Sequence, residues 1–190
     1  MNWKNTARRS AVIVIILVLS ILCAFVYQLV WDKIDRQRYP RQFSEYVTEF
    51  SEVYGVPEYV IYAVIKVESD FTSNAESHAG AIGLMQIMPD SFDWISMRLK
   101  RTTEVGMMYD PRTNIEYGTY YLSYLYMRYN RWDEVFAAYN AGFGRVDQWL
   151  TDPEYTDEDG NLIRIPIAET KKYVKKVNDA IDVYKRLYYQ

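Results

Sequence analysis

Cysteine, histidine, proline and glycine are all scarce in this chain. Of its 190 residues, one is cysteine (Cys23) and one is histidine (His78). A single cysteine excludes an intrachain disulfide and a cysteine-based zinc site. Six prolines and eight glycines are too few for a collagen-like or low-complexity chain. We therefore expect an ordinary globular protein with no metal site and no cofactor.

An excess of positive charge is also missing. Lysine and arginine total 22 against 25 aspartate and glutamate, which gives a net charge of −3. This balance argues against a general nucleic-acid binder, whose electrostatic footprint is basic. Hydrophobic residues make up 49% of the chain, enough to form a packed core. The length suits one domain of ordinary size.

One long apolar run is present near the N-terminus. Residues 11–30 contain no charged side chain. As a helix of about 1.5 Å rise per residue they would span roughly 30 Å, the thickness of a bilayer core. A cleaved signal peptide and a lipoprotein signal are the alternatives, but no clear cleavage site follows the run, and Leu22 before Cys23 is a poor lipoprotein motif. We expect an uncleaved transmembrane anchor.

The charges on either side of this run do not fix its orientation. Lys4, Arg8 and Arg9 precede it, and four further basic residues follow it within residues 33–41. The positive-inside rule counts both flanks and does not decide between them. The expected organisation is a short N-terminal segment (1–10), a transmembrane helix (11–30), a juxtamembrane linker (31–42) and a soluble domain (43–190).

Apolar residues recur at helical spacing through the soluble domain, which predicts a mainly all-α fold. Gly55 ends a first helix and Pro57 opens a second, which carries an apolar run up to Val67. Asp110 followed by Pro111 predicts the start of a long tyrosine-rich helix. The expected helices are 43–54, 58–69, 90–99, 111–129, 133–141, 143–150 and 168–187. Residues 70–89 read as a loop with one short helical turn, and 151–166 as an excursion or small hairpin.

A carboxylate closes the second of these helices. Glu68 follows Val64, Ile65 and Val67, and such surroundings oppose ionisation and raise the pKa of a carboxyl. A carboxyl protonated near neutral pH is suited to general acid catalysis. The alternative is a solvated glutamate at the end of a helix, and the helix pattern alone does not exclude it.

Four motifs in order resemble the catalytic domain of the soluble lytic transglycosylase family. They are Glu68-Ser69, then Gly80-Ala81-x-Gly83-Leu84-Met85-Gln86-x-Met88-Pro89, then Ala138-Tyr139-Asn140-Ala141-Gly142, and finally Glu169-Thr170-x-x-Tyr173-Val174. The resemblance covers roughly residues 43–186. It implies a lysozyme-like α fold with a peptidoglycan groove, and cleavage of the N-acetylmuramic acid–β-1,4–N-acetylglucosamine bond to a 1,6-anhydromuramic end. By resemblance, Glu68 acts first as acid and then as base.

The resemblance also assigns residues around Glu68. Ser69 is expected to orient Glu68 or the substrate, and Gly83 to let the loop backbone approach the sugar. Met85 and Gln86 are expected to line the groove, with core packing an equal alternative for Met85. The other expected site residues are Tyr139 and Asn140 at the scissile bond, Tyr173 nearby, and Glu169, which either holds a hydrogen-bond network or is a first-turn acid favoured by the helix dipole.

These residues predict a membrane-anchored enzyme whose partners are peptidoglycan strands and the membrane, with no nucleic acid. Because peptidoglycan lies outside the cytoplasm, the N-terminus is expected inside and the domain outside. Two alternatives remain: a muramidase of similar fold that uses water, and a non-catalytic wall-binding scaffold.

Overall fold

The chain divides into two compact units, one ending at Pro40 and the other running from Arg41. The computed structural model describes residues 3–102 and 104–189. The first unit consists of helix α1 (Trp3–Arg38). It continues through most of the segment expected to be a linker, because residues 31–38 contain neither proline nor glycine. Residues 1–2 of the expected N-terminal segment lie outside the described residues.

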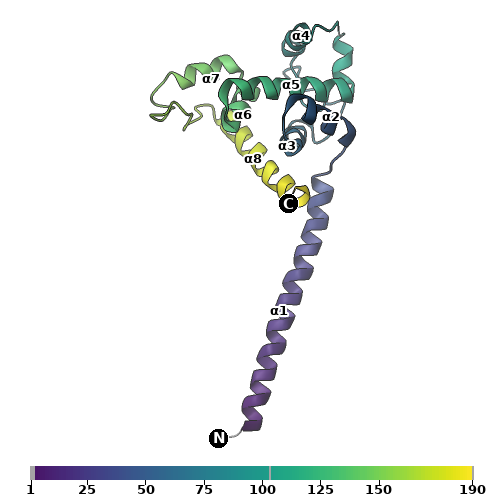
Figure 1. Ribbon diagram of the computed structural model, residues 1–190, viewed down its shortest axis with the longest axis vertical. Helices are drawn as coiled ribbons and strands as arrows, with labels where there is room; N and C mark the ends of the chain where they lie inside the picture. Colours follow the sequence, from purple (N-terminus) through teal and green to yellow (C-terminus); the bar gives the residue numbers. More distant parts are fainter. Residues whose placement is uncertain (1–2, 103, 190) are drawn as a thin grey trace. The chain divides into compact units, whose positions relative to one another are not determined.

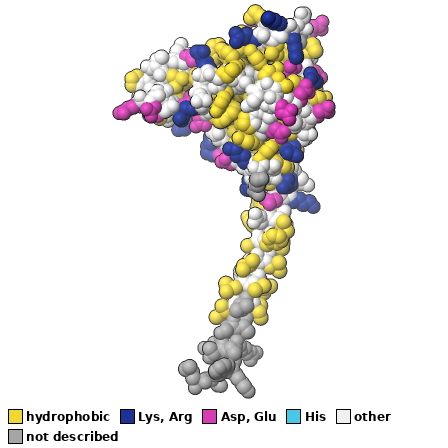
Figure 2. Space-filling model, viewed as in Figure 1, with side chains coloured by type: hydrophobic (Ala, Val, Ile, Leu, Met, Phe, Trp, Pro, Cys, Tyr) yellow, Lys and Arg dark blue, Asp and Glu magenta, His cyan; other side chains and the backbone are white. Residues whose placement is uncertain are grey.

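Apolar side chains are exposed along α1 between Val12 and Trp31 (Figure 2). The stretch Ile15–Arg38 is long and apolar enough to cross a membrane. Within the apolar run, the hydroxyl of Ser20 donates a 2.9 Å hydrogen bond to the carbonyl of Ile16. This bond gives the Ser20 hydroxyl a partner, which the hydrocarbon core of a membrane could not supply.

The second unit is built of helices, in agreement with the expected fold class (Figure 1). Its described residues form no extended strand, and the pairing between extended segments is limited to isolated bridges such as Ile82–Ile87 and Thr156–Leu162. The elements are α2 (Ser44–Tyr54), α3 (Glu58–Ser69), α4 (Pro89–Arg98), the 3₁₀ helix η1 (Val105–Tyr109), α5 (Pro111–Tyr129), α6 (Trp132–Ala141), α7 (Phe143–Leu150) and α8 (Ala168–Tyr188).

Helix α5 forms the centre of this unit. It packs against α2, α4, α6 and η1, while α6 also contacts α7 and α8, and α8 lies along α3. Apolar side chains from these faces make one core, in which the largest fully buried members include Tyr62, Phe92, Tyr117, Phe136 and Tyr184. The packing of α3, α6 and α8 therefore brings three of the four sequence motifs together.

The limits of all seven expected helices are confirmed to within one residue. Asp110 caps α5 as expected, with its carboxylate accepting a 2.8 Å hydrogen bond from the Thr113 amide. Helix α4 begins one residue before the expected range, because Pro89 occupies its first position. The short helical turn expected in 70–89 is wrong: bridges hold this loop instead. The 3₁₀ helix η1 was not expected.

Candidate active site

The carboxyl group of Glu68 lies at the junction of α3 and α8. Helix α3 places Glu68 in its last turn, and α8 supplies Tyr173 from across the junction. The hydroxyl of Tyr173 donates a 2.7 Å hydrogen bond to Oε1 of Glu68. Among the described residues no hydrogen bond to Oε2 is found, so Tyr173 holds one of the two carboxyl oxygens.

Burial raises the pKa of Glu68 from 4.5 to about 7, and the hydrogen bond from Tyr173 acts in the opposite direction. The pKa of Tyr173 is raised well above 10, mainly by burial and further by the negative charge of Glu68. Glu68 is consequently poised to give or take a proton near neutral pH, while Tyr173 keeps its proton. The elevated pKa expected from the apolar run is present.

A loop formed by residues 82–87 faces the end of α3. The hydroxyl of Ser69 donates a 2.8 Å hydrogen bond to the Leu84 carbonyl, so Ser69 ties this loop to the helix that carries Glu68. Buried Asn114 of α5 holds the same loop with two bonds: its Oδ1 accepts from the Met85 amide at 2.8 Å, and its Nδ2 donates to the Ile82 carbonyl at 3.0 Å. Nδ2 also donates to the Met108 carbonyl of η1 at 2.7 Å. The loop is therefore fixed from both sides.

Gly83 is required where this loop approaches α5. Its φ is +82°, and a Cβ built there would lie 2.5 Å from the Met108 carbonyl oxygen and 2.3 Å from Nδ2 of Asn114. Only glycine fits both the backbone conformation and the contact. The expected role of Gly83 was a close approach to the sugar, whereas the close approach in the structure is to η1 and α5.

Met85 belongs to the core. Its side chain is fully buried, and a Cβ added at Gly118 of α5 would lie 2.3 Å from its sulfur. Of the two alternatives expected for Met85, the structure has core packing, because the absence of a side chain at Gly118 leaves a space that Met85 fills. The backbone of Met85 still serves the site: its carbonyl accepts a 2.8 Å hydrogen bond from the Tyr139 hydroxyl.

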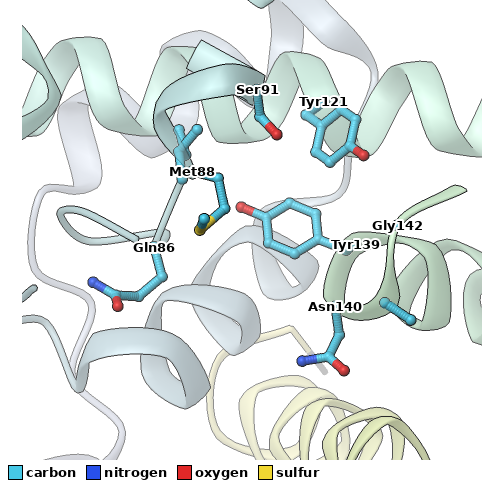
Figure 3. A pocket seen from close by; sticks show the side chains of 9 residues that line it. Gln86, Met88, Ser91, Tyr121, Tyr139, Asn140 and Gly142 are labelled. Atoms are coloured by element: carbon cyan, nitrogen blue, oxygen red, sulfur yellow. The ribbon is translucent and has the colours of Figure 1, made fainter. Parts of the chain in front are cut away.

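A pocket of about 250 Å³ opens between this loop, α4, α5 and α6 (Figure 3). Gln86 lies at its edge with a positive φ of 49°, and its Nε2 donates to the Gly83 carbonyl at 2.9 Å. That bond orients the side-chain amide of Gln86 while its oxygen stays available to a ligand. The lining residues are Gln86, Ile87, Met88, Ser91, Tyr121, Tyr139, Asn140, Ala141 and Gly142.

Tyr139 connects the pocket to Glu68. Burial raises the pKa of Tyr139 well above 10, and the negative charge of Glu68 raises it further. Its ring packs at 5.4 Å, centroid to centroid, from that of Tyr121. The Tyr139 hydroxyl bonds Met85 rather than the carboxyl, so the hydroxyl directly on Glu68 belongs to Tyr173.

Asn140 is held by Thr170, the residue next to Glu169, which was expected to hold the hydrogen-bond network. Oδ1 of Asn140 accepts a 2.8 Å hydrogen bond from the hydroxyl of Thr170, which is buried. Glu169 is exposed in the first turn of α8, consistent with an acid favoured by the helix dipole. The network role expected for Glu169 is therefore taken by Thr170, because the helical rotation that turns Thr170 inward leaves Glu169 facing solvent.

Sequence reasoning did not single out Thr170, Ser91 and Tyr121 as site residues. Thr170 belongs to the last of the four motifs. Which of the two neighbours, Glu169 or Thr170, faces the site depends on how α8 packs. Ser91 and Tyr121 reach the pocket from α4 and α5, and a local pattern carries no signal for such long-range proximity. Across the described residues no group of side chains suited to hold a metal ion is found.

The family model for the transglycosylase SLT domain matches residues 45–161 of the chain. The chain belongs to this family. The match covers α2 to the loop after α7 and includes Glu68, the 82–87 loop and the Tyr139-Asn140 pair.

Relatives and solved structures agree with this assignment. The soluble lytic murein transglycosylase of Escherichia coli (strain K12) is 34% identical over 163 residues, covering 83% of this chain and 25% of the relative. Membrane-bound lytic murein transglycosylase C of Cronobacter sakazakii is 31% identical over 193 residues, covering 88% of this chain and 52% of the relative. The X-ray structure of an inactive Glu-to-Gln mutant of lytic transglycosylase Slt from Pseudomonas aeruginosa superposes with a TM-score of 0.72 and 32% identity, covering 80% of this chain and 25% of that one. The chain thus spans a quarter to a half of the length of these proteins.

Proposed function

We propose that this SLT-family chain is a peptidoglycan lytic transglycosylase. The observation that carries the proposal is Glu68, a carboxyl with a pKa of about 7 that accepts a hydrogen bond from Tyr173. Its charge acts on Tyr139, which lines a pocket of polar and aromatic side chains. General acid catalysis is most effective when the pKa of the acid lies near the working pH. The inactive Glu-to-Gln mutant of the Pseudomonas aeruginosa relative supports an essential glutamate in such enzymes.

In the proposed reaction Glu68 acts twice. Its carboxyl proton goes to the glycosidic oxygen, and the bond between that oxygen and C1 of N-acetylmuramic acid breaks. The C6 hydroxyl of the same sugar then attacks C1, and its proton returns to the Glu68 carboxylate. The products are a free 4-hydroxyl on N-acetylglucosamine and a 1,6-anhydromuramic end, with no water consumed. Intramolecular attack needs no bimolecular encounter, which favours this route.

The neighbouring acids support a single-carboxylate mechanism. Hydrolytic glycosidases place a second carboxyl about 5–9.5 Å from the first. Asp70, two residues from Glu68, is exposed and bound by Lys66, and Glu76 is exposed and accepts a 3.0 Å bond from the Tyr109 hydroxyl. Both are engaged at the surface, which favours transfer to the sugar's own hydroxyl over hydrolysis.

Product analysis tests this function. Purified peptidoglycan is digested with the detergent-solubilised full chain, and the muropeptides are identified by mass spectrometry. We expect products one water lighter than hydrolysis products and without a reducible end. Reducing-end products would instead identify a hydrolytic muramidase, and no products would identify a wall-binding scaffold. Glu68→Gln should abolish cleavage, and Glu76→Gln, which changes an exposed acid outside the pocket lining, should not.

We also propose that α1 anchors the protein in the cell membrane in a single pass, with residues 1–10 cytoplasmic, 11–30 spanning and the domain outside. Its apolar length, its exposed apolar side chains and the internal bond of Ser20 support this arrangement. N-terminal sequencing of the membrane fraction should recover the intact start of the chain, whereas a new N-terminus after residue 30 would indicate a cleaved signal. Reporter fusions at the C-terminus should be active only outside the cytoplasm.

A further inference from the structure

Arg98 lies on an aromatic surface beside the pocket. Its guanidinium carbon is 5.4 Å from the ring centroid of Trp94 and 5.5 Å from that of Tyr124. The Tyr120 hydroxyl also lies 3.5 Å from Nε. A guanidinium held against rings in this way keeps its planar fork oriented, so less entropy is lost when it binds a partner.

The fork of Arg98 has no acidic partner in the described part of the chain: none of the ion pairs found there includes it. Arg128 offers a contrast. It too lies on rings, 5.7 Å from both Tyr129 and Phe143, but its Nε donates to Asp147 at 3.0 Å and its fork is occupied. Of these two arginines, Arg128 is paired with a carboxylate and Arg98 is open to an external anion.

The position of Arg98 relates it to the candidate active site. Ser91, Trp94 and Arg98 follow the i, i+3, i+7 spacing of one helix face on α4, and Ser91 lines the pocket. At 1.5 Å per residue, Arg98 is about 10 Å from Ser91 along that face. The Trp94 ring is 6.1 Å from that of Tyr121, a second lining residue. A continuous aromatic surface therefore leads from the pocket to the guanidinium.

Resting on the proposed function, we propose that Arg98, stacked on Trp94 and Tyr124, binds a carboxylate of the peptide stem of peptidoglycan and makes the enzyme prefer stem-bearing over naked glycan. Stem peptides are attached to the lactyl group of muramic acid and carry free carboxylates. An extended peptide advances at most about 3.5 Å per residue, so three residues reach from the pocket to Arg98. A planar fork matches a carboxylate with two parallel hydrogen bonds, which a lysine cannot reproduce.

Cleavage kinetics of the detergent-solubilised full chain test this proposal. The substrates are peptidoglycan with intact stems and the same glycan stripped of stems by an amidase. We expect Arg98→Gln to raise KM for the stem-bearing substrate about 10-fold, as for the loss of one charged hydrogen-bonded pair, and to leave kcat and the naked-glycan kinetics unchanged. Arg98→Lys should recover little. The matched control Arg128→Gln should leave the preference unchanged. An equal effect of Arg98→Gln on both substrates, or no effect, would overturn the proposal.

A binding measurement separates this inference from the proposed function. Calorimetric titration of the Glu68→Gln chain with an uncrosslinked disaccharide-peptide should give a Kd that weakens about 10-fold with Arg98→Gln and equally when the stem carboxylates are amidated. Arg98-dependent binding without cleavage by the wild type would retain the inference and remove the transglycosylase. Cleavage that does not depend on Arg98 would retain the transglycosylase and remove the inference about Arg98. If Arg98→Gln weakened binding of a glycerol phosphate polymer but not of the muropeptide, the ligand of Arg98 would be a phosphate polymer and not the peptide stem, and the proposal would be overturned.

Discussion

The hydroxyl of Tyr173 donates a 2.7 Å hydrogen bond to Oε1 of Glu68, across 105 residues of sequence. This bond stabilises the ionised carboxylate, whereas burial stabilises the protonated form. The effect of burial is the larger of the two, and the pKa of Glu68 is therefore raised to about 7. Glu68 can therefore serve as an acid in one step and a base in the next with little free-energy difference between its two protonation states.

Replacing Tyr173 by phenylalanine should shift the pH dependence of cleavage. The first step needs protonated Glu68, so activity should fall as the pH rises through about 7. Without the hydroxyl the carboxylate loses a donor, its pKa rises, and the alkaline limb of kcat against pH should move to higher pH while the maximum decreases. Tyr139→Phe, which removes a hydroxyl bonded to the Met85 carbonyl instead, is the comparison. An alkaline limb that moves to lower pH in Tyr173→Phe contradicts this account.

Glu68→Gln should stabilise the protein at neutral and higher pH. The folded chain binds the Glu68 proton more tightly than the unfolded chain, whose carboxyl has a pKa near 4.5. The stability of the wild type therefore falls between about pH 4.5 and 7 and is level above that range. The variant lacks this loss, so its advantage in free energy of unfolding should be about 2–3 kcal/mol at pH 8 and near zero at pH 4. Thermal unfolding at the two pH values measures it, and an equal difference at both would refute the assigned burial.

The loss of stability on replacing each of three glycines by alanine should depend on the space around that glycine. Gly83→Ala is expected to be the most damaging, because it combines a φ of +82° with a backbone oxygen 2.5 Å away. Gly118→Ala would bring its Cβ within 3 Å of the Sδ, Cε and Cβ atoms of Met85 and should cost about 1–3 kcal/mol. Gly144→Ala in α7 meets open space and should be neutral or stabilising by up to about 1 kcal/mol. Chemical denaturation gives the three values, and any other order would count against the close approach of the loop to α5.

Asn114→Ala should destabilise the protein and impair the site together. It leaves the Met85 amide and the carbonyls of Ile82 and Met108 without their partner, at about 1–3 kcal/mol for each buried group that water does not reach. Because Met85 also accepts the Tyr139 hydroxyl, a loosened loop should lower kcat as well. Asn114→Asp keeps the acceptor for the Met85 amide but loses both donated bonds, so it tests the donors separately. Denaturant midpoints and kcat measured on the same preparations would disprove the role if both stay at wild-type values.

Several features of the site were predictable from the sequence. The apolar residues before Glu68 indicated an elevated pKa, and burial within the folded domain produces it. The four motifs predicted which helices would form the site, and Asp110-Pro111 predicted the start of α5. The direction of the Met85 side chain could not be predicted, because it depends on the space at Gly118, which is 33 positions away.

The sequence by itself determined the apolar N-terminal helix, the helical spacing of the soluble part and the motifs of the SLT family, because each depends on residues close together in the chain. The packing of α8 against α3 and α6, and of α4 against α5, decided the rest. It placed the Tyr173 hydroxyl on Glu68, turned Thr170 rather than Glu169 toward Asn140, and left the Arg98 guanidinium open on its aromatic surface. These are contacts between distant segments, and only the close packing of complementary side-chain surfaces selects them.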